Sequence, residues 1–374
     1  MESGITAFRV DAVNTASTRF DDIIDVRAPS EFAEDHLPGA INLPVLDDEQ
    51  RAHVGMVYKQ VSPFDARRIG AALVAENAAR HIAGPLSGHD GSWQPLIYCW
   101  RGGQRSEALA TILAQVGWRV SRLEGGYKSW RSMVVRRVQE LGFPGRVIVL
   151  DGNTGSAKTA ILKRLATRGH QVLDLEAMAN HRGSLFGHMG KQPGQKMFEG
   201  RLATVLEYLD PARPVLVEAE SSRIGNVTLP KAVWRGLCAA PRLVLRVPVS
   251  ARAEYSARDY ADIAEDPGLV HNILRRLAPL HPAERIKNWL HLADSGEWRV
   301  LAELLMRDHY DPRYTKHRGR YADREYARAE IDDLTDLDRA TGQVEAALAE
   351  MPGCPVEGLL TQHDPGDDSH QAQH

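Results

Sequence analysis

The sequence predicts an α/β fold built from two consecutive units, each with a parallel sheet, and three observations lead to this prediction. The chain has 374 residues, more than the roughly 250–300 at which a single core usually stops growing. Short apolar runs alternate with segments of helical apolar spacing, the pattern of a parallel sheet covered by helices on both faces. Glycine-rich turns follow two of the apolar runs, at residues 99–106 and 152–159.

The first unit is expected to span residues 1–132, and a basic linker helix is expected to follow over 133–145. Gly142 and Pro144 predict the end of that helix, because glycine caps helices and proline does not continue them. The elements predicted within the first unit are strands at 21–26, 97–99 and 118–126 and a helix at 106–118.

The second unit is expected to span residues 146–350. Its last part, 275–350, reads as a mostly helical and highly charged extension. Residues 351–374 are polar and lack apolar anchors, so we expect a disordered tail. The remaining elements predicted here are strands at 146–152, 171–176, 214–221 and 242–250 and a helix at 156–169.

The composition is that of an ordinary globular protein and excludes several classes. Hydrophobic residues make up 43% and charged residues 25%, which excludes a largely disordered, collagen-like or coiled-coil chain. The net charge of −3 excludes a protein that is basic all over, although a local basic face remains compatible with nucleic acid. No apolar stretch is long enough to cross a membrane and residues 1–30 lack a secretory signal, so a soluble cytoplasmic protein without membrane contact is expected.

The first chemical motif is a cysteine that opens a loop between a strand and a helix. Cys99 follows the second predicted strand, in the sequence CWRGGQRS. Such a loop points backbone N–H groups inward, and the helix dipole adds positive potential, so it binds anions. A thiol there should have a lowered pKa and act as a nucleophile. The loop residues that we expect to form this site are Arg101, Gly102, Gly103, Gln104, Arg105 and Ser106.

A structural role for Cys99 is the alternative, since free cysteines often serve as small buried hydrophobic residues. That alternative leaves the two glycines and two arginines after Cys99 unexplained, so we favour the catalytic interpretation. Cys238 and Cys354 have no neighbours of this kind. With three cysteines and no CxxC spacing, neither a cysteine zinc site nor a disulfide framework is expected.

The N-terminal unit resembles the rhodanese family. The resemblance rests on DVRAPSEFAEDHLPGAINLPV (25–45), YCWRGGQRS (98–106) and LEGGYKSW (123–130), in this order. It implies a rhodanese-like domain with a parallel sheet, in which the loop cysteine carries sulfur or selenium. The spacing C-x5-R is one residue longer than in the common sulfurtransferase loop and is similar to that of rhodanese-related phosphatases. A phosphatase therefore remains an alternative, beside a transferase whose donor is a large or phosphorylated sulfur or selenium compound.

The second chemical motif is a phosphate-binding loop. The strand VIVLDG runs into GNTGSAKT (152–159) and then a helix, which is the context that a Walker A motif requires. Ala157 replaces the second glycine, so the loop could be tighter or suit another ligand than ATP. Lys158 would reach terminal phosphates, and Thr159 could hold Mg²⁺. The residues expected to bind phosphate are Gly152, Asn153, Thr154, Gly155, Ser156, Lys158 and Thr159.

Two polar stretches are candidates for a second part of this site. A Walker B acid should end a nearby apolar strand, and Glu218 or Glu220 in PVLVEAES fits that description. Ordinary loop composition explains each stretch equally well when it is taken alone. Arginines beside a phosphate loop commonly bind substrate anions, which favours a functional role for both stretches. The further candidates are His181, Arg182, Ser184 and Arg223.

A basic segment rich in tyrosine, residues 309–328, is a candidate for RNA binding. It holds six Lys/Arg against three acids, with four tyrosines between them. Basic groups neutralise phosphates and aromatic rings stack on unpaired bases. A solvated helix whose tyrosines anchor it to the core is the alternative, and the segment alone slightly favours it. The candidate RNA-binding residues are Tyr310, Arg313, Tyr314, Lys316, Arg318 and Arg320.

Taken together, the rhodanese-like domain, the phosphate loop and the stretches ANHRGSLFGH, VEAES and HYDPRY resemble the tRNA 2-selenouridine synthase family over residues 5–330. This resemblance implies a P-loop NTPase-like second domain. It also implies a transferase that converts 2-thiouridine at the wobble position of tRNA to 2-selenouridine through an S-geranyl intermediate. A rhodanese-related phosphatase, an ATP-dependent RNA sulfurtransferase and a catalytically inactive RNA adaptor are the weaker alternatives.

The same resemblance implies the ligands and partners. Geranyl diphosphate would bind at the phosphate loop, and selenophosphate would react at Cys99 with Arg101 and Arg105 holding the anion. The RNA partner would be the tRNA anticodon loop, and an enzyme that produces selenophosphate is a possible protein partner. No tightly bound cofactor is expected, Mg²⁺ is possible, and no residue is assigned as a certain metal ligand.

Overall fold

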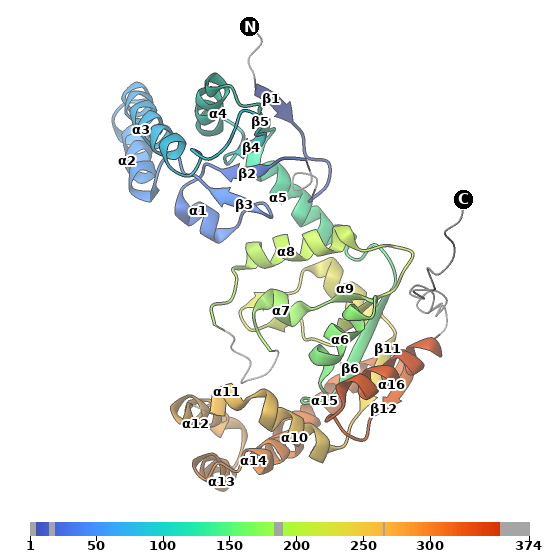
Figure 1. Ribbon diagram of the computed structural model, residues 1–374. Coiled ribbons are helices and arrows are strands. Elements are labelled where there is room, and N and C mark those ends of the chain that lie inside the picture. Colours follow the sequence, from blue (N-terminus) through green and yellow to red (C-terminus); the bar gives the residue numbers. More distant parts are fainter. Residues whose placement is uncertain (1–4, 15–18, 183–189, 265, 352–374) are drawn as a thin grey trace, which may run out of the picture.

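The computed structural model describes residues 5–14, 19–182, 190–264 and 266–351, which form two α/β units (Figure 1). The first unit contains a five-stranded parallel sheet in the order β1-β5-β4-β2-β3. Strand β4 lies at its centre, so the loop that begins with Cys99 leaves from the middle of the sheet. The strands are β1 (Ile5–Phe8), β2 (Asp22–Asp25), β3 (Ala40–Asn42), β4 (Pro95–Tyr98) and β5 (Val120–Leu123).

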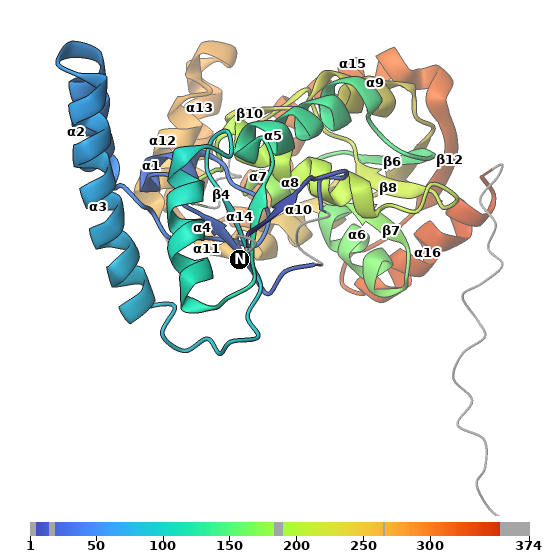
Figure 2. The ribbon, with the colours of Figure 1, turned by 90° about the horizontal axis from the view of Figure 1, so that it is seen from above.

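Helices cover both faces of this sheet. Between β3 and β4 the chain forms a hairpin of two long helices, α2 and α3, which stands apart on one side of the molecule (Figure 2). Our sequence predictions did not include this hairpin. Asp47 and Ser62 begin its two helices by accepting hydrogen bonds from Gln50 N–H and Asp65 N–H. The helices of the unit are α1 (Pro29–Glu34), α2 (Asp48–Gln60), α3 (Pro63–Ala83), α4 (Gln104–Val116) and α5 (Gly126–Arg136).

The linker is not a separate helix. Helix α5 begins directly after β5 and continues as a π-helical stretch, η2 (Arg137–Leu141). As the sequence predicts, Gly142 ends it, with a φ of +71° that suits glycine. One continuous helix thus starts within the first unit and reaches the second.

The second unit contains another five-stranded parallel sheet, in the order β12-β11-β6-β8-β7. Strand β6 is central and runs directly into the glycine-rich turn 152–157. The strands are β6 (Val147–Gly152), β7 (Gln171–Leu173), β8 (Val215–Glu218), β11 (Arg242–Arg246) and β12 (Glu325–Glu330), and a small hairpin of β9 (Arg223–Ile224) and β10 (Val227–Thr228) stands beside them.

Strand β12 is the main difference from the sequence prediction for this unit. It pairs with β11 at the edge of the sheet, although residues 309–328 suggested a helix. Its side chains alternate between half-buried or buried and exposed positions, and Ala329 is buried in the apolar cluster that includes α16. Tertiary pairing with β11 therefore determines the structure of a segment whose charged composition gives no strand signal.

Helices occupy most of the remaining second unit, as the sequence predicts. Helices α14, η4 and α15 follow one another without interruption and lead back toward the glycine-rich turn. The helices are α6 (Lys158–Thr167), α7 (Leu175–Ala179), α8 (Gln195–Tyr208), α9 (Lys231–Ala239), α10 (Val249–Asp259), α11 (Ala261–Ala264), α12 (Pro267–Arg275), η3 (Ala278–Leu280), α13 (Ala283–Asp294), α14 (Trp298–Leu305), η4 (Met306–Tyr310), α15 (Asp311–Arg318), η5 (Gly319–Arg324) and α16 (Leu337–Ala349).

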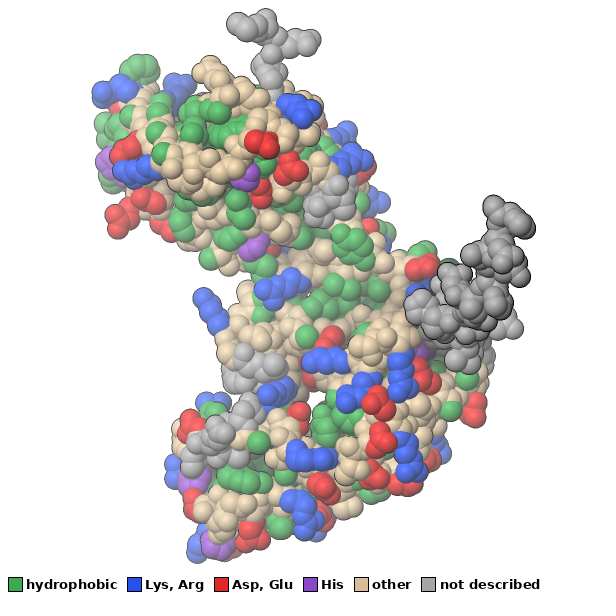
Figure 3. Space-filling view, in the orientation of Figure 1, with side chains coloured by type: hydrophobic (Ala, Val, Ile, Leu, Met, Phe, Trp, Pro, Cys, Tyr) green, Lys and Arg blue, Asp and Glu red, His purple; other side chains and the backbone are tan. Residues whose placement is uncertain are grey.

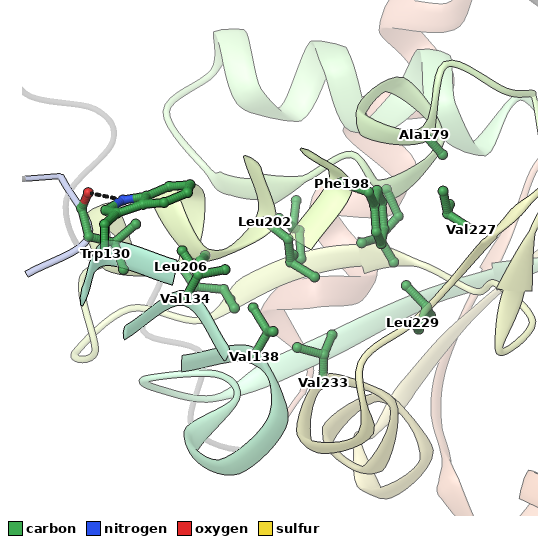
Figure 4. Close-up of a cluster of buried hydrophobic side chains, with 14 of the residues drawn as sticks. Trp130, Val134, Val138, Ala179, Phe198, Leu202, Leu206, Val227, Leu229 and Val233 are labelled. Carbon is green, nitrogen blue, oxygen red and sulfur yellow. Dashed lines mark hydrogen bonds between the residues drawn. The ribbon is translucent and has the colours of Figure 1, made fainter. Parts of the chain in front are cut away.

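A continuous apolar cluster joins the two units (Figure 4). Trp130, Val134 and Val138 on the α5–η2 helix pack in the same cluster as Phe198 and Leu202 of α8. The Trp130 indole N–H donates to the Val13 carbonyl at 3.0 Å, which also ties the start of the first unit to this cluster. The cluster makes α5, with its η2 continuation, a shared structural element of both units.

The end of the described chain is also packed. Met351 is buried in the cluster formed by α6, α16 and one face of the second sheet, which corrects its assignment to a disordered tail. Residues 352–374, the rest of that predicted tail, lie outside the described residues. Among the described residues, no helix is long and apolar enough to span a membrane.

Replacing Trp130 with alanine should lower the free energy of unfolding by about 3–5 kcal/mol, because it empties a fully buried indole site and leaves the Val13 carbonyl without its donor. Urea unfolding followed by circular dichroism measures this loss. Val135→Ala on the same helix is the control, since Val135 is exposed, and it should change stability by less than about 0.5 kcal/mol. Equal effects of the two substitutions would contradict the assignment of Trp130 to a joint core.

Candidate functional site

The cysteine loop curls tightly around the Cys99 sulfur. Cys99 is buried, at 3% exposure, directly after β4, and helix α4 starts at Gln104. The Ser106 hydroxyl lies 3.2 Å from Cys99 Sγ and 3.0 Å from the Gly103 carbonyl. The thiol therefore sits between the loop and the first turn of α4.

The surroundings of Cys99 favour the thiolate. Burial alone would raise the pKa of the thiol. Hydrogen bonds from the Ser106 hydroxyl and from the backbone N–H groups of Ser106 and Arg101, together with the charge of Arg105, outweigh burial and lower the pKa. This lowering of the pKa of Cys99 agrees with the sequence prediction of an activated thiol.

The two loop arginines differ in their surroundings. Arg101 is exposed, whereas Arg105 is half-buried and donates to Glu31 Oε2 at 2.9 Å. Arg51 also contacts Glu31, at 3.0 Å. An anion that binds at this loop must therefore share Arg105 with the Glu31 carboxylate, a partner that the sequence motif alone does not indicate.

The backbone of the LEGGYKSW segment (123–130) packs closely against the cysteine loop. Gly126 has a φ of +59°, and a Cβ at this position would lie 2.3 Å from the Cys99 carbonyl and 2.5 Å from the Gly102 nitrogen. The next residue, Tyr127, donates its N–H to the Cys99 carbonyl at 2.9 Å. The LEGGYKSW segment thus positions the cysteine loop, because any side chain at Gly126 would displace it.

The phosphate loop has the left-handed backbone that a Walker A turn requires. Gly155 has a φ of +82°, and a Cβ there would lie 2.6 Å from Met306 Cε. Ala157 keeps a φ of +57° in the place of the usual glycine. A left-handed alanine costs about 1–2 kcal/mol, and its buried methyl group packs against the core below the sheet. The substitution therefore preserves the turn.

Lys158 and Thr159 contact the loop and its acidic neighbour. Lys158 Nζ donates to the Gly152 carbonyl at 2.8 Å and lies 5.7 Å from the centre of the Tyr314 ring. The Thr159 hydroxyl donates to Glu176 Oε2 at 2.8 Å. To contact a bound phosphate, the Lys158 ammonium group and the Thr159 hydroxyl would have to leave these partners.

An ion pair between the buried Arg252 and the half-buried Asp311, which we did not predict, holds the outer side of the phosphate loop. Arg252 is 4% exposed and donates to the Thr154 carbonyl at 3.0 Å and to Asp311 Oδ2 at 2.7 Å. Asp311 also accepts a hydrogen bond from the Asn153 side chain at 3.0 Å. Asp311 belongs to the HYDPRY stretch, so that stretch holds the loop through a carboxylate that the sequence reasoning did not select.

Acidic side chains gather at the inner end of the loop. Glu218 ends β8 fully buried, and its Oε1 accepts the Glu176 N–H at 2.9 Å. Burial and then the charges of Asp174 and Glu176 raise the pKa of Glu218 to about 8. Burial and the same kind of repulsion raise the pKa of Glu220 well above its usual range. The sequence predicted Glu218 and Glu220 here, but not Asp174 and Glu176.

This acidic group is a candidate magnesium site by its chemistry. Its oxygen atoms are the type of ligand that Mg²⁺ prefers, and Thr159 is close to it. Within the described ranges, however, no group of three or more acidic, histidine or cysteine side chains has a geometry that could hold a metal ion. A magnesium ion remains a prediction, and no step below depends on it.

One pocket of about 280 Å³ is lined by nine of the site residues predicted in the second unit. His181 and Arg182 line it from the end of α7, Glu220 from the end of β8, and Tyr314 from α15. Arg182 also donates to the Asp259 carbonyl at 3.2 Å. The predicted phosphate-loop residues in the lining are Thr154, Gly155, Ser156, Lys158 and Thr159.

Other predicted residues lie elsewhere. Arg223 is in the small β9–β10 hairpin and donates to the Gly225 carbonyl at 2.9 Å, away from the pocket lining. Arg313 and Lys316 are exposed on α15. Ser184 lies outside the described residues, as do the side chains of Arg318 and Arg320. The structure thus gathers Tyr314, but not the whole basic segment, at the phosphate loop.

A second, apolar pocket adjoins the phosphate pocket. Thr154, Ser256 and Tyr260 line both. Tyr310, which we predicted to bind RNA, lines the apolar pocket. Its other lining residues come from α10 through η4 and are Ala257, Ile263, Val270, Trp298, Leu301, Ala302, Leu305 and Met306. A ligand with a charged head and an apolar tail would therefore find both environments side by side.

Comparison with known proteins matches both units to family models. Residues 11–133 match the Rhodanese-like domain, and residues 145–272 match the tRNA 2-selenouridine synthase AAA domain. A tRNA 2-selenouridine synthase of Hahella chejuensis is 32% identical, with 81% of this chain and 86% of that protein covered. The synthase of Sulfurovum sp. is 38% identical, with coverage of 65% and 67%. The chain belongs to the tRNA 2-selenouridine synthase family.

A third synthase, that of Cupriavidus pinatubonensis, is 31% identical over 84% of this chain and 93% of its own length. The similarity therefore extends across both units, including the cysteine loop and the phosphate loop. The resemblance seen in the sequence is confirmed, and the chain is an enzyme of the transferase class.

For this family member, Ser106→Ala should raise the pKa of Cys99, because it removes the hydroxyl that hydrogen-bonds to the sulfur. Fewer thiolates at neutral pH should slow alkylation by iodoacetamide, and the midpoint of the pH–rate curve should move upward. Ser132→Ala, at an exposed position on α5, is the control. An unchanged pH–rate curve for Ser106→Ala would show that the hydroxyl does not stabilise the thiolate.

Proposed function

We propose that the chain converts 2-thiouridine in tRNA to 2-selenouridine through an S-geranyl intermediate, with geranyl diphosphate and selenophosphate as substrates. The observation that carries the geranyl step is the apolar pocket beside the phosphate loop. A nucleotide would place a polar base and ribose beyond its phosphates, whereas geranyl diphosphate has a hydrocarbon tail. Membership in the synthase family supports tRNA as the substrate.

In the first step, the sulfur of 2-thiouridine attacks C1 of geranyl diphosphate. A carbon–sulfur bond forms, the carbon–oxygen bond to diphosphate breaks, and the N3 proton of the base passes to water. The phosphate-loop N–H groups and Lys158 would hold the diphosphate and stabilise the charge that develops on it. Alkylation turns a poor leaving group on the base into a good one.

In the second step, selenium from selenophosphate replaces the alkylated sulfur at C2 of the base. A carbon–selenium bond forms, geranylthiol leaves, and water takes the phosphoryl group as phosphate. The two protons of that water go to the thiol and to N3 of the base. We place this step at Cys99, whose thiolate would attack the phosphorus of selenophosphate and release selenide, while the loop N–H groups, Arg101 and Arg105 hold the donor anion. Water then takes the phosphoryl group from Cys99 and restores the thiolate. An enzyme that produces selenophosphate would supply the donor.

Lys158→Ala should abolish geranylation, because the diphosphate loses its cationic partner, while previously geranylated tRNA should still be converted to the seleno form. Mass spectrometry of digested tRNA distinguishes the three nucleosides. Normal geranylation by Lys158→Ala would contradict the assignment of the phosphate loop to this step.

Cys99→Ala should have the opposite effect and stop at the geranylated nucleoside. Cys238→Ala is the matched control, because Cys238 is half-buried near Tyr321 and away from both loops, and it should complete both steps. Accumulation of unmodified 2-thiouridine with Cys99→Ala would refute this division between the two sites.

Filling the apolar pocket should weaken prenyl binding selectively. Ala302→Phe adds a ring on the pocket wall formed by α14 and should raise the KM for geranyl diphosphate about tenfold through overpacking. Competitive inhibition by inorganic diphosphate should stay unchanged, because the phosphate loop is intact. A parallel loss of affinity for both ligands would show that the substitution acts on the loop instead of on a prenyl pocket.

A further inference from the structure

A third pocket lies beside the cysteine loop, between the two units. Its volume is about 280 Å³. Trp100 and Tyr127 form its aromatic part, Lys128, Arg131 and Arg136 line it from α5, and Lys196 from α8. Neither the cysteine chemistry nor the phosphate loop accounts for this combination of rings and cations.

The pocket is physically coupled to Cys99. Trp100 follows Cys99 in the chain, and its carbonyl accepts the Lys128 N–H at 3.0 Å. The rings of Trp100 and Tyr127 lie 5.1 Å apart between centroids. A molecule in this pocket would therefore touch the same backbone segment that shapes the cysteine loop.

Its four basic side chains fall into two pairs. Arg131 donates to the Lys196 carbonyl at 3.0 Å and forms an ion pair with Glu199, so it helps to join the units. Lys196 pairs with Glu34 at 2.6 Å. Lys128 and Arg136, in contrast, are exposed and form no ion pair among the described residues, although Glu140, four residues beyond Arg136, also lines the pocket.

Lys128 and Arg136 thus carry charge that an external anion could neutralise. They are eight residues apart on α5, so their Cα atoms lie about 12 Å apart along the helix axis and about 80° apart around it, and both side chains line the pocket. A short single-stranded segment that follows the pocket could therefore place one phosphate at each cation. The face shown in Figure 3, by comparison, has Lys and Arg mixed with Asp and Glu over the second unit.

We propose that this pocket binds the tRNA strand next to the reacting nucleotide, with phosphates at Lys128 and Arg136 and one unpaired base against the Trp100 ring. Aromatic rings stack on splayed single-stranded bases, and basic side chains hold the backbone. The site would guide the strand past Cys99. This inference rests on the proposed function for its RNA substrate and adds where that RNA is held.

The test measures equilibrium binding of full-length protein to a 2-thiouridine-containing tRNA, with neither geranyl diphosphate nor selenophosphate present. Lys128→Gln together with Arg136→Gln should weaken binding about tenfold or more at low salt. The slope of log affinity against log salt should fall by about 0.7 for each lost phosphate contact. Trp100→Leu, which keeps an apolar side chain, should weaken binding about fivefold or more with an unchanged slope, because stacking is lost without loss of charge.

Lys59→Gln together with Arg119→Gln is the matched control. It removes the same charge from the same unit, from exposed positions on α2 and just before β5, at the opposite end of the strands from Cys99. Equal effects of the two double variants, or an unchanged salt slope in Lys128→Gln/Arg136→Gln, would overturn the proposed site.

Lys158→Ala separates this inference from the proposed function. The Lys158→Ala variant should bind tRNA normally and fail to geranylate it. Normal geranylation by this variant would contradict the role of the phosphate loop and leave the proposed RNA-binding pocket unaffected. Failure of the unsubstituted protein to bind tRNA would overturn both proposals.

Discussion

The α5–η2 helix is the element on which the rest of the structure depends. At its start, Tyr127 donates to the Cys99 carbonyl and fixes the cysteine loop. Farther along, Trp130, Val134 and Val138 belong to the apolar cluster shared with the second unit. Because one rigid helix carries both sets of contacts, the cysteine loop has a defined position relative to the phosphate-loop unit. Two steps on one nucleotide would benefit from such a fixed arrangement.

Both loops arise from the same architectural rule. Each follows the central strand of a parallel sheet, where the carboxyl ends of strands and the starts of helices create sites for anions. The surroundings then differ. Cys99 has a thiolate-stabilising hydroxyl from Ser106, whereas Lys158 has an apolar pocket nearby and carboxylates on the inner side. The chemistry proposed for each site follows from these neighbours.

Much of this arrangement could be predicted from sequence, because local patterns produce it. The strand before Cys99, the glycine turn at 152–157 and the helix end at Gly142 each depend on residues adjacent in the chain. Long-range contacts could not be predicted in the same way. Strand β12 exists because it pairs with β11, and nothing in its charged sequence signals this.

The functional sites also depend on contacts between residues far apart in the sequence, which local patterns do not predict. Arg252 holds the phosphate loop through Asp311, which is 59 residues away in sequence, and Glu31 contacts Arg105 from 74 residues away. Tyr310 and Tyr314, predicted from composition as RNA contacts, line the apolar and phosphate pockets. Composition alone slightly favoured a solvated helix over an RNA-binding segment, and only the fold shows which pocket each tyrosine lines.

The most direct test of the account is a time course of tRNA nucleosides after the protein is mixed with 2-thiouridine tRNA, geranyl diphosphate and selenophosphate. Mass spectrometry of quenched samples should show S-geranyl-2-thiouridine rising first and falling as 2-selenouridine appears. Without geranyl diphosphate, neither product should form. Formation of 2-selenouridine at the full rate in the absence of geranyl diphosphate would contradict the two-step scheme and the role given to the phosphate loop.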